Sequence, residues 1–193
     1  TPTGVRWEIG EWSLEEGLGA ILGCSGGACL TLYSRPTTKI FVKTFRCDNF
    51  YEKVSGELPF DVFISAAAIS DWRIEKFSQN KIKKNNNEKL KLGFLRNIDV
   101  LKKISNNKLR PKLVIGFSAE TSNLITNSKK KLTEKNCDWI VANNVGIEEV
   151  FGSNYNKISI VTKNRIRKCK KMTKVNCAKE IINDIYTNIL NNE

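Results

Sequence analysis

The chain has 193 residues, of which 32 are Lys or Arg and 20 are Asp or Glu, and it contains six Cys and no His. This length, with 40% apolar and 27% charged residues, is typical of one folded globular domain. The absence of His excludes Ser-His-Asp and Cys-His relays and His-ligated metal sites, whereas the net charge of +12 favours an anionic or phosphorylated partner.

The charge and the glycines are unevenly distributed. Residues 73–135 carry a net charge of +12, whereas residues 1–30 carry −3 and hold seven of the twelve Gly. The first thirty residues therefore differ in character from the rest. The Cys residues form no C-x-x-C pair, and no signal peptide or membrane-spanning run of about 20 apolar residues is present. We expect a cytoplasmic protein with reduced thiols and no membrane association.

Short apolar runs predict strands, and segments with 3.6-residue spacing predict helices between them. The predicted strands are 29–33, 40–45, 62–68, 113–118 and 139–142, with a hairpin over 158–162 and 164–168. The predicted helices are 49–58, 97–104, 123–135 and 174–190. Strands alternate with helices, so we expect an α/β fold with a doubly wound sheet and an antiparallel edge.

Residues 73–95 interrupt this alternation. The segment around 81–88 is too polar and rich in Asn to pack, and residues 89–95 then alternate between apolar and polar. We expect a long mobile loop followed by a half-exposed strand. Long loops inside compact domains often serve as lids or binding arms.

The carboxyl ends of the predicted strands are the places where a ligand would bind in such a sheet. Asp71 follows the first buried strand and could contact a ribose hydroxyl or a metal ion; alternatively it caps a helix under which the neighbouring alanines pack. Phe117 ends the next strand and could stack on a base or belong to the core. Asn143 and Asn144 end the third, where they could form a turn or contact a ligand.

Two groups of lysines could bind phosphate, because ammonium groups neutralise phosphoryl charge. The first is Lys81 to Lys84, and the second is Lys129 to Lys131 with Lys135. Either group could instead be a solvated surface. Their position after strands that end on one side of the sheet favours the phosphate interpretation.

Five motifs together resemble the phosphopantothenate cysteine ligases, also called phosphopantothenoylcysteine synthetases. The motifs are SAAAISDWR (65–73), KIKK (81–84), LRNIDVL (95–101), VIGFSAET (114–121) and the spaced K...KNCDWIVAN (131–143). They occur in order over residues 57–190. The resemblance implies a modified Rossmann-like fold with a long lid loop or arm, and a homodimer.

The chemistry implied by the resemblance is a ligation in coenzyme A synthesis. The carboxylate of 4′-phosphopantothenate attacks CTP, with Mg²⁺, to give an acyl-cytidylate, and L-cysteine then displaces CMP. The KIKK motif with an N-x-D segment resembles the CTP-dependent branch of the family, although Ile98 stands where that segment usually has Pro. Many bacterial members carry a preceding flavin-dependent decarboxylase that needs a His, and we expect neither that domain nor flavin here. Residues 1–193 are interpreted as one synthetase-like domain.

The resemblance also assigns site residues. Lys81 falls on the first lysine of the KIKK motif and is assigned to formation of the acyl-nucleotide. The residues assigned to nucleotide binding are Ser65, Ala66, Ala67, Asp71, Lys81, Leu95, Arg96, Asn97, Ile98, Phe117, Lys131 and Lys135.

The first third of the chain departs from the family pattern. A stretch like VRxISNxSSGxMG is usual there, and this chain has Val-Arg and glycines but neither the Asn nor the Ser-Ser-Gly. Glu11, Glu15 and Glu16 would repel a phosphate. The start is truncated or diverged, or substrate binding has changed, and no residues are assigned to phosphopantothenate.

Two alternatives to the ligase remain open. One is a nucleotide-binding module that has lost activity. The other is a basic nucleic-acid-binding domain, which the scarcity of aromatic residues between 73 and 110 argues against. We therefore expect no nucleic-acid partner.

Overall fold

A central mixed sheet organises the computed structural model, which describes residues 28–34, 39–45, 50–66, 70–75, 92–145 and 154–190. Among these residues, seven strands pair in the order β10-β9-β7-β6-β3-β1-β2. The strands are β1 (Ala28–Ser34), β2 (Lys39–Phe45), β3 (Val62–Ser65), β6 (Leu113–Glu120), β7 (Trp139–Asn144), β9 (Ile158–Thr162) and β10 (Ile166–Lys168). The pairs β3–β6 and β6–β7 are parallel, and the other pairs are antiparallel. The predicted α/β fold and its antiparallel edge are confirmed, and the opposite edge is antiparallel as well.

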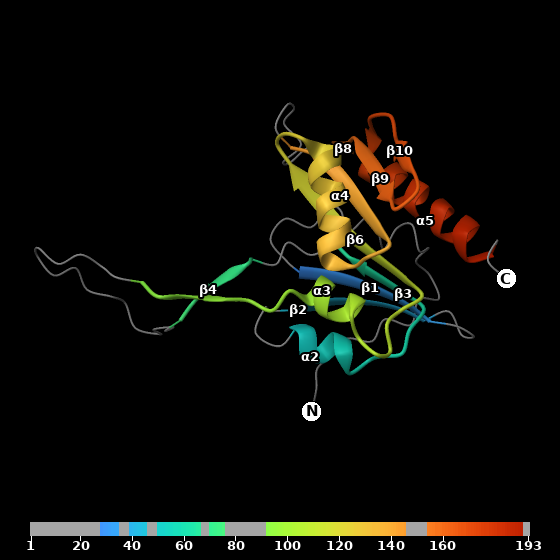
Figure 1. Cartoon of the computed structure of the whole chain (residues 1–193). Coiled ribbons are helices and arrows are strands. Elements are labelled where there is room, and N and C mark those ends of the chain that lie inside the picture. Colours follow the sequence, from blue (N-terminus) through green and yellow to red (C-terminus); the bar gives the residue numbers. More distant parts are fainter. Residues whose placement is uncertain are drawn as a thin grey trace, which may run out of the picture.

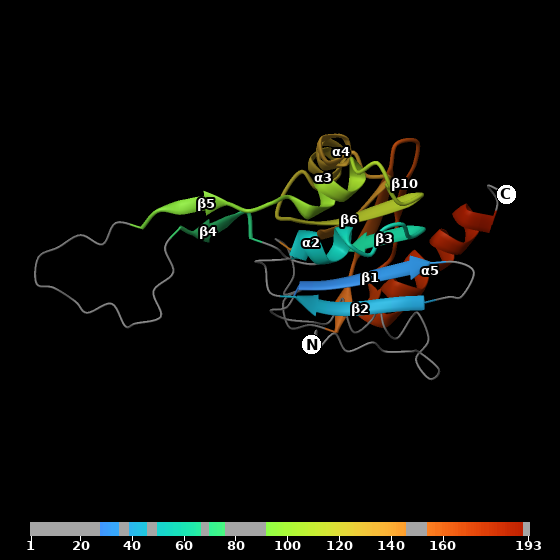
Figure 2. The same ribbon diagram turned by 90° about the horizontal axis from the view of Figure 1, so that it is seen from below.

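Helices cover both faces of this sheet (Figures 1 and 2). The helices are α2 (Phe50–Ser55), α3 (Val100–Ser105), α4 (Leu124–Lys135) and α5 (Lys174–Leu190). Helices α2, α3 and α4 lie on one face, and α5 lies on the other (Figure 2). Among the described residues, no helix combines the length and the apolar character that crossing a bilayer would require.

Successive side chains of the central strands belong to different layers, because side chains alternate across a strand. On β3, Val62 and Ile64 pack toward α5, whereas Phe63 packs toward α2 and α3. On β7, Val141 faces α5 and Ile140 faces the other helices. Both faces of these strands are therefore covered by apolar side chains at most positions, which explains the nearly continuous apolar runs in the sequence.

One face of helix α5 packs into the core of the protein. The side chains in its core face are Cys177, Ala178, Ile181, Ile182 and Ile185. The 3.6-residue spacing of the sequence also predicts Val175 and Ile189 on this face; Val175 is exposed instead, Cys177 is fully buried, and the side chain of Ile189 lies outside the described part of the chain. Burial raises the pKa of the Cys177 thiol to about 11, so this cysteine acts as a small core residue.

Several of the predicted elements have different boundaries in the structure. The helix expected over 97–104 begins at Val100, because the Oδ1 atom of Asp99 accepts a hydrogen bond from the backbone N–H of Lys102 at 3.0 Å and caps it. The strand expected over 62–68 ends at Ser65. Helix α4 is bounded by two asparagines with left-handed backbones, Asn123 (φ 50°) and Asn136 (φ 54°).

A two-stranded arm projects from the body of the molecule (Figures 1 and 2). It consists of β4 (Trp72–Ile74) paired antiparallel with β5 (Phe94–Arg96). A half-exposed strand was expected over 89–95; among the described residues the strand is 94–96, with exposed side chains and a partner strand that was not expected. Residues 76–91 lie outside the described part, so the predicted lid stays a prediction.

An ion-pair network ties α3, α4 and β6 together. Asp138 Oδ2 accepts hydrogen bonds from Arg110 Nη2 at 2.8 Å and from the backbone N–H of Val114 at 2.7 Å. Arg110 also donates through Nε to the carbonyl oxygen of Ser105, at the end of α3. These contacts join the end of α3 and the segment that follows α4 to strand β6. A second two-stranded sheet, β8 (Tyr155–Asn156) with β11 (Met172–Thr173), precedes α5.

We expect Ser128→Ala to raise the free energy of unfolding by up to about 1 kcal/mol, because the buried hydroxyl of Ser128 has no hydrogen-bond partner. The matched control is Ser105→Ala. The Ser105 hydroxyl is equally buried but donates to the carbonyl oxygen of Leu101 at 2.8 Å, so its loss is expected to cost about 1 kcal/mol. Urea unfolding of the three proteins measures both changes. A destabilised Ser128→Ala variant would contradict the expectation.

Candidate functional site

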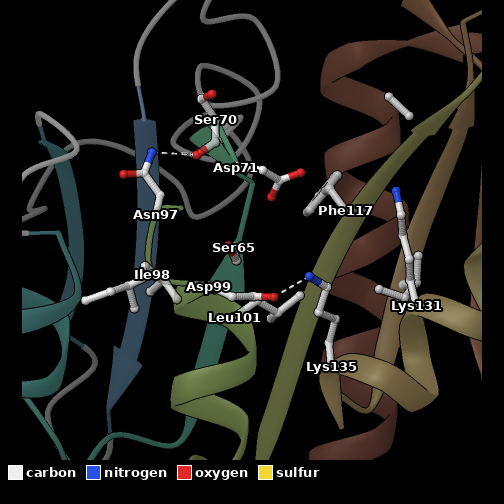
Figure 3. Close-up of a pocket in the computed structure, with 13 residues that line it drawn as sticks. Ser65, Ser70, Asp71, Asn97, Ile98, Asp99, Leu101, Phe117, Lys131 and Lys135 are labelled. Carbon is white, nitrogen blue, oxygen red and sulfur yellow. Dashed lines mark hydrogen bonds and ion pairs between the residues drawn. The ribbon is translucent and has the colours of Figure 1, made fainter. Parts of the chain in front are cut away.

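A pocket of about 450 Å³ lies at the carboxyl ends of β3 and β6, between the base of the arm and α4 (Figure 3). This volume lies within the range of small-molecule sites. Its lining consists of Ser65, Ser70, Asp71, Asn97, Ile98, Asp99, Val100, Leu101, Phe117, Ala119, Lys131, Lys135 and Ile140. The position is the one where open α/β sheets bind ligands.

One end of the pocket is built by the base of the arm. The backbone N–H of Asn97 donates to the carbonyl oxygen of Asp71 at 2.8 Å, and the Asn97 side chain donates to the carbonyl oxygen of Ser70 at 2.7 Å. The Asp71 carboxylate makes no hydrogen bond or ion pair with the described residues, and it is exposed. Asp71 precedes strand β4, so the alternative of a helix cap is wrong. Its carboxylate is available to a ligand.

The other end of the pocket carries two lysines of α4 (Figure 3). Lys131 and Lys135 are four residues apart and therefore lie on the same face of the helix. Their neighbours Lys129 and Lys130 are exposed, and Lys130 pairs with Glu134 at 3.8 Å on the outer surface. The lysine-rich helix therefore has a pocket-facing pair and a solvated pair.

Each pocket lysine is held by a carboxylate from another element. Lys135 pairs with Asp99 Oδ2, while the other oxygen of the same carboxylate caps α3. Lys131 Nζ lies 2.6 Å from Glu120 Oε1 and 3.2 Å from Ser118 Oγ. Ser118 and Glu120 both reach α4 because side chains two apart on β6 point to the same side.

Glu120 is the most strongly perturbed carboxyl among the described residues. The hydrogen bond from Lys131, together with those from Ser118 at 2.7 Å and Asn127 at 2.9 Å, lowers its pKa to about 2 against the opposing effect of burial. Glu120 is therefore ionised at every pH at which the protein would act.

An apolar floor separates the polar ends. Val100, Leu101, Phe117 and Ile140 line it. Gly116 allows this packing, because a Cβ atom there would lie 2.5 Å from a methyl group of Leu101 and 3.0 Å from one of Ile140. Phe117 is half-buried and packs against the core on the α5 side, as one of its two predicted roles requires; it also lines the pocket, and stacking on a base stays a prediction.

The pocket brings together most of the predicted site residues that the structure describes. These are Ser65, Asp71, Asn97, Ile98, Phe117, Lys131 and Lys135. Ala66 packs against the core instead, and Leu95 and Arg96 lie on β5 of the arm, outside the lining. Ala67 and Lys81 lie outside the described residues. Nucleotide binding by all of these residues stays a prediction.

Several residues of the site were not predicted. Ser70, Asp99 and Leu101 line the pocket, and Glu120 and Ser118 hold Lys131. A signal existed for Asp99, since an Asp before an apolar helical run is a common N-cap. Asn143 and Asn144 lie within β7, so neither forms a turn. Both are absent from the pocket lining, and a ligand contact by either residue stays a prediction.

Fold and pocket together define an α/β protein with a two-lysine pocket at the carboxyl edge of its parallel strands. Residues 25–189 match the family described as DNA/pantothenate metabolism flavoprotein C-terminal domain. The chain belongs to this family, which confirms the resemblance found in the sequence.

Comparison with individual proteins gives the same result. The coenzyme A biosynthesis bifunctional protein CoaBC of Borreliella burgdorferi is 36% identical over 169 residues, which cover 83% of this chain and 42% of that protein. The protein of the same name from Haemophilus influenzae is 33% identical over 124 residues, or 64% of this chain and 31% of that protein. The chain thus spans less than half the length of these curated relatives.

A solved structure supports the fold. The crystal structure of the C-terminal domain of a coenzyme A biosynthesis bifunctional protein CoaBC matches with a TM-score of 0.57 and 28% sequence identity. The match covers 74% of this chain and 62% of that chain.

The acid stability of the protein should depend on Glu120. Its pKa is lower in the folded state than the ordinary value of 4.5, so its stabilising contribution is complete above about pH 4.5 and is lost as the pH falls toward 2. We expect Glu120→Gln to reduce the free energy of unfolding by about 1–3 kcal/mol at pH 7 and to flatten its decline between pH 5 and pH 2. Chemical denaturation across this pH range measures both effects.

The control for this experiment is Glu134→Gln, which removes a carboxylate from the solvent-exposed pair with Lys130. This variant should keep the wild-type pH dependence, because exposed pairs contribute little. A Glu120→Gln profile as steep as that of the wild type would show that Glu120 does not contribute in this way.

Proposed function

We propose that this chain is a CTP-dependent ligase that joins 4′-phosphopantothenate to L-cysteine in coenzyme A biosynthesis. The observation that carries the proposal is the pocket, where Lys131 and Lys135 converge with Asp71 at the carboxyl edge of the sheet in a member of this family. The names of the relatives, coenzyme A biosynthesis bifunctional proteins, support the same conclusion.

The proposed reaction has two steps. A carboxylate oxygen of 4′-phosphopantothenate attacks the α-phosphorus of CTP, and pyrophosphate leaves. The amine of cysteine then attacks the acyl carbon and loses a proton, the bond to the cytidylate breaks, and the products are 4′-phosphopantothenoylcysteine and CMP. Both steps move negative charge between phosphoryl oxygens, so they depend on fixed cations more than on an imidazole. A chain without His is suited to this chemistry.

The two ends of the pocket suit the two ends of a nucleoside triphosphate. Lys131 and Lys135 would face the phosphates, because ammonium groups are point charges that bind phosphate well. The apolar floor with Phe117 would accommodate the base, and the base of the arm would meet the ribose. Lys81, assigned to acyl-nucleotide formation by the resemblance, would reach this site from the segment between β4 and β5.

Magnesium fits the residues present. Mg²⁺ in nucleotide sites is usually held by one or two carboxylates together with phosphate oxygens. The described residues contain no cluster of three or more metal-ligating side chains, but the Asp71 carboxylate lines the pocket without a partner among them. Asp71 would hold the ion together with the triphosphate, and the ion would neutralise phosphoryl charge.

A diverged nucleotide-binding module is the second candidate, because residues 1–30 lack the Asn and Ser-Ser-Gly of the family pattern. CTP binding without turnover would favour it. We propose a cytoplasmic location together with the ligase activity, as the sequence led us to expect.

We expect wild-type protein to release pyrophosphate from CTP only when 4′-phosphopantothenate and Mg²⁺ are both present. Lys135→Gln should lower kcat/KM for CTP by about 10- to 100-fold, because it removes a phosphate-binding charge and leaves Asp99 unpaired in the pocket. Lys130→Gln is the matched control, since it makes the same change on the outer surface of α4. A coupled pyrophosphate assay measures these rates, and equal effects of the two variants would argue against the site.

We also propose that the homodimer implied by the family resemblance buries the arm. The exposed large apolar side chains on or beside the arm are Trp72, Ile74, Leu92, Phe94, Leu95 and Ile98. Trp72 and Phe94 are 57% and 55% exposed, and patches of this kind usually mark an interaction surface.

We expect the double variant Trp72→Ser/Phe94→Ser to shift the protein from dimer to monomer, because each large apolar side chain contributes on the order of 1–3 kcal/mol when buried. Light scattering coupled to gel filtration measures the mass. Tyr186→Ser is the control, since this side chain is similarly exposed on α5. A wild-type monomer, or a double variant that stays dimeric, would contradict the proposal.

A further inference from the structure

We propose that Glu120 is a positioning residue that fixes the Lys131 ammonium group in one orientation toward a phosphoryl group of the bound ligand. The inference rests on the proposed function, which supplies the phosphorylated ligand. It adds a role for a residue that does not itself line the pocket.

The Glu120 carboxylate joins the end of β6 to two successive turns of α4. Its Oε1 atom meets Lys131 Nζ at 2.6 Å and accepts a hydrogen bond from Ser118 Oγ at 2.7 Å. Its Oε2 atom accepts from Asn127 Nδ2 at 2.9 Å, and Asn127 also donates to the carbonyl oxygen of Ser122. With both oxygens engaged and a side chain only 15% exposed, the carboxylate has one stable orientation.

This arrangement restricts Lys131 to one direction. An ammonium group has three N–H donors, and those of Lys131 face Glu120 and Ser118 at hydrogen-bond distance. One donor is left for a ligand, and Lys131 lines the pocket. A lysine on a flexible four-carbon stem is thereby converted into a donor of defined position.

The charge of Glu120 indicates that it serves orientation more than affinity. A carboxylate beside a phosphate site weakens the attraction between lysine and phosphate, since like charges repel. Glu120 nevertheless remains ionised, because its bonds lower its pKa to about 2. Removing this carboxylate frees the lysine charge and simultaneously loosens the lysine, so the effects on binding oppose each other. Turnover depends on the orientation of the ammonium group, so removing the carboxylate lowers kcat and no opposing effect offsets this loss.

The test compares Glu120→Gln with Glu134→Gln, which removes the same charge from the outer surface of α4. We expect Glu120→Gln to lower kcat for pyrophosphate release by about tenfold or more, with the CTP dissociation constant changed less than about threefold. Glu134→Gln should stay within about twofold of the wild type in both measurements. A kcat of Glu120→Gln within twofold of the wild type would overturn the proposal.

A double-mutant cycle with Lys131→Gln tests whether Glu120 acts through this lysine. If it does, Glu120→Gln lowers kcat no further once Lys131 has been replaced. If the two substitutions instead lower kcat by factors that multiply in the double variant, Glu120 has a separate structural role and the positioning role is refuted. Should Glu120→Gln fold poorly, Ser118→Ala removes one bond to the carboxylate and one to Lys131, two of the contacts that fix the ammonium group. This variant is expected to lower kcat about two- to fivefold when Lys131 is present and not at all once Lys131 has been replaced; equal effects with and without Lys131 count against the proposal.

An NMR measurement that does not require turnover can test this inference separately from the proposed function. In ¹H–¹⁵N spectra of the lysine ammonium groups, a fixed Lys131 gives a signal that shifts on addition of tripolyphosphate. We expect Glu120→Gln to lose that signal and Glu134→Gln to retain it. If wild-type protein releases no pyrophosphate, the proposed ligase fails, yet loss of the signal in Glu120→Gln still supports the positioning role. An unchanged Lys131 signal in Glu120→Gln overturns it.

Discussion

Because β3, β6 and β7 run parallel in the middle of the sheet, both of their faces must be covered, and their carboxyl ends meet at one edge. Along β6, successive side chains alternate between the two faces, and this alternation both covers the sheet and builds part of the pocket at its carboxyl edge. Gly116, Ser118 and Glu120 share the face toward α3 and α4, where they admit Leu101 and hold Lys131. Phe117 packs on the other side. A register shift of one residue would therefore disrupt the core and the lysine end of the pocket together.

Net charge alone does not describe this pocket. The excess of +12 falls within residues 73–135, but the two lysines that enter the pocket are each paired with a carboxylate. The unpaired or exposed lysines, such as Lys129, lie on the outer surface. The net positive charge would attract a phosphate ligand from a distance. Within the pocket, the ligand would then contact a few donors that are fixed in position.

The sequence allowed much of the fold to be predicted, because runs such as 113–117 and 139–142 contain no polar side chain, and short runs of this kind are typical of strands buried on both faces. The start of α3 was predicted wrongly, since apolar spacing continues through Ile98 while the cap at Asp99 determines where the helix begins. Strand β4 was missed because Trp72–Ile74 is short and exposed. The pocket lysines were predicted from their helix, but their carboxylate partners depend on tertiary contacts 11 and 36 residues away in sequence.

Residues 97–99 connect the arm, α3 and α4. Asn97 bonds to the carbonyl oxygens of Ser70 and Asp71 at the base of the arm. Two residues later, Asp99 caps α3 with one oxygen and holds Lys135 with the other. The position of Lys135 is thus set by a segment that also anchors the arm, whereas the position of Lys131 is set within β6 and α4. The two pocket lysines therefore respond to different parts of the molecule, and only Lys135 is joined to the segment from which the arm extends.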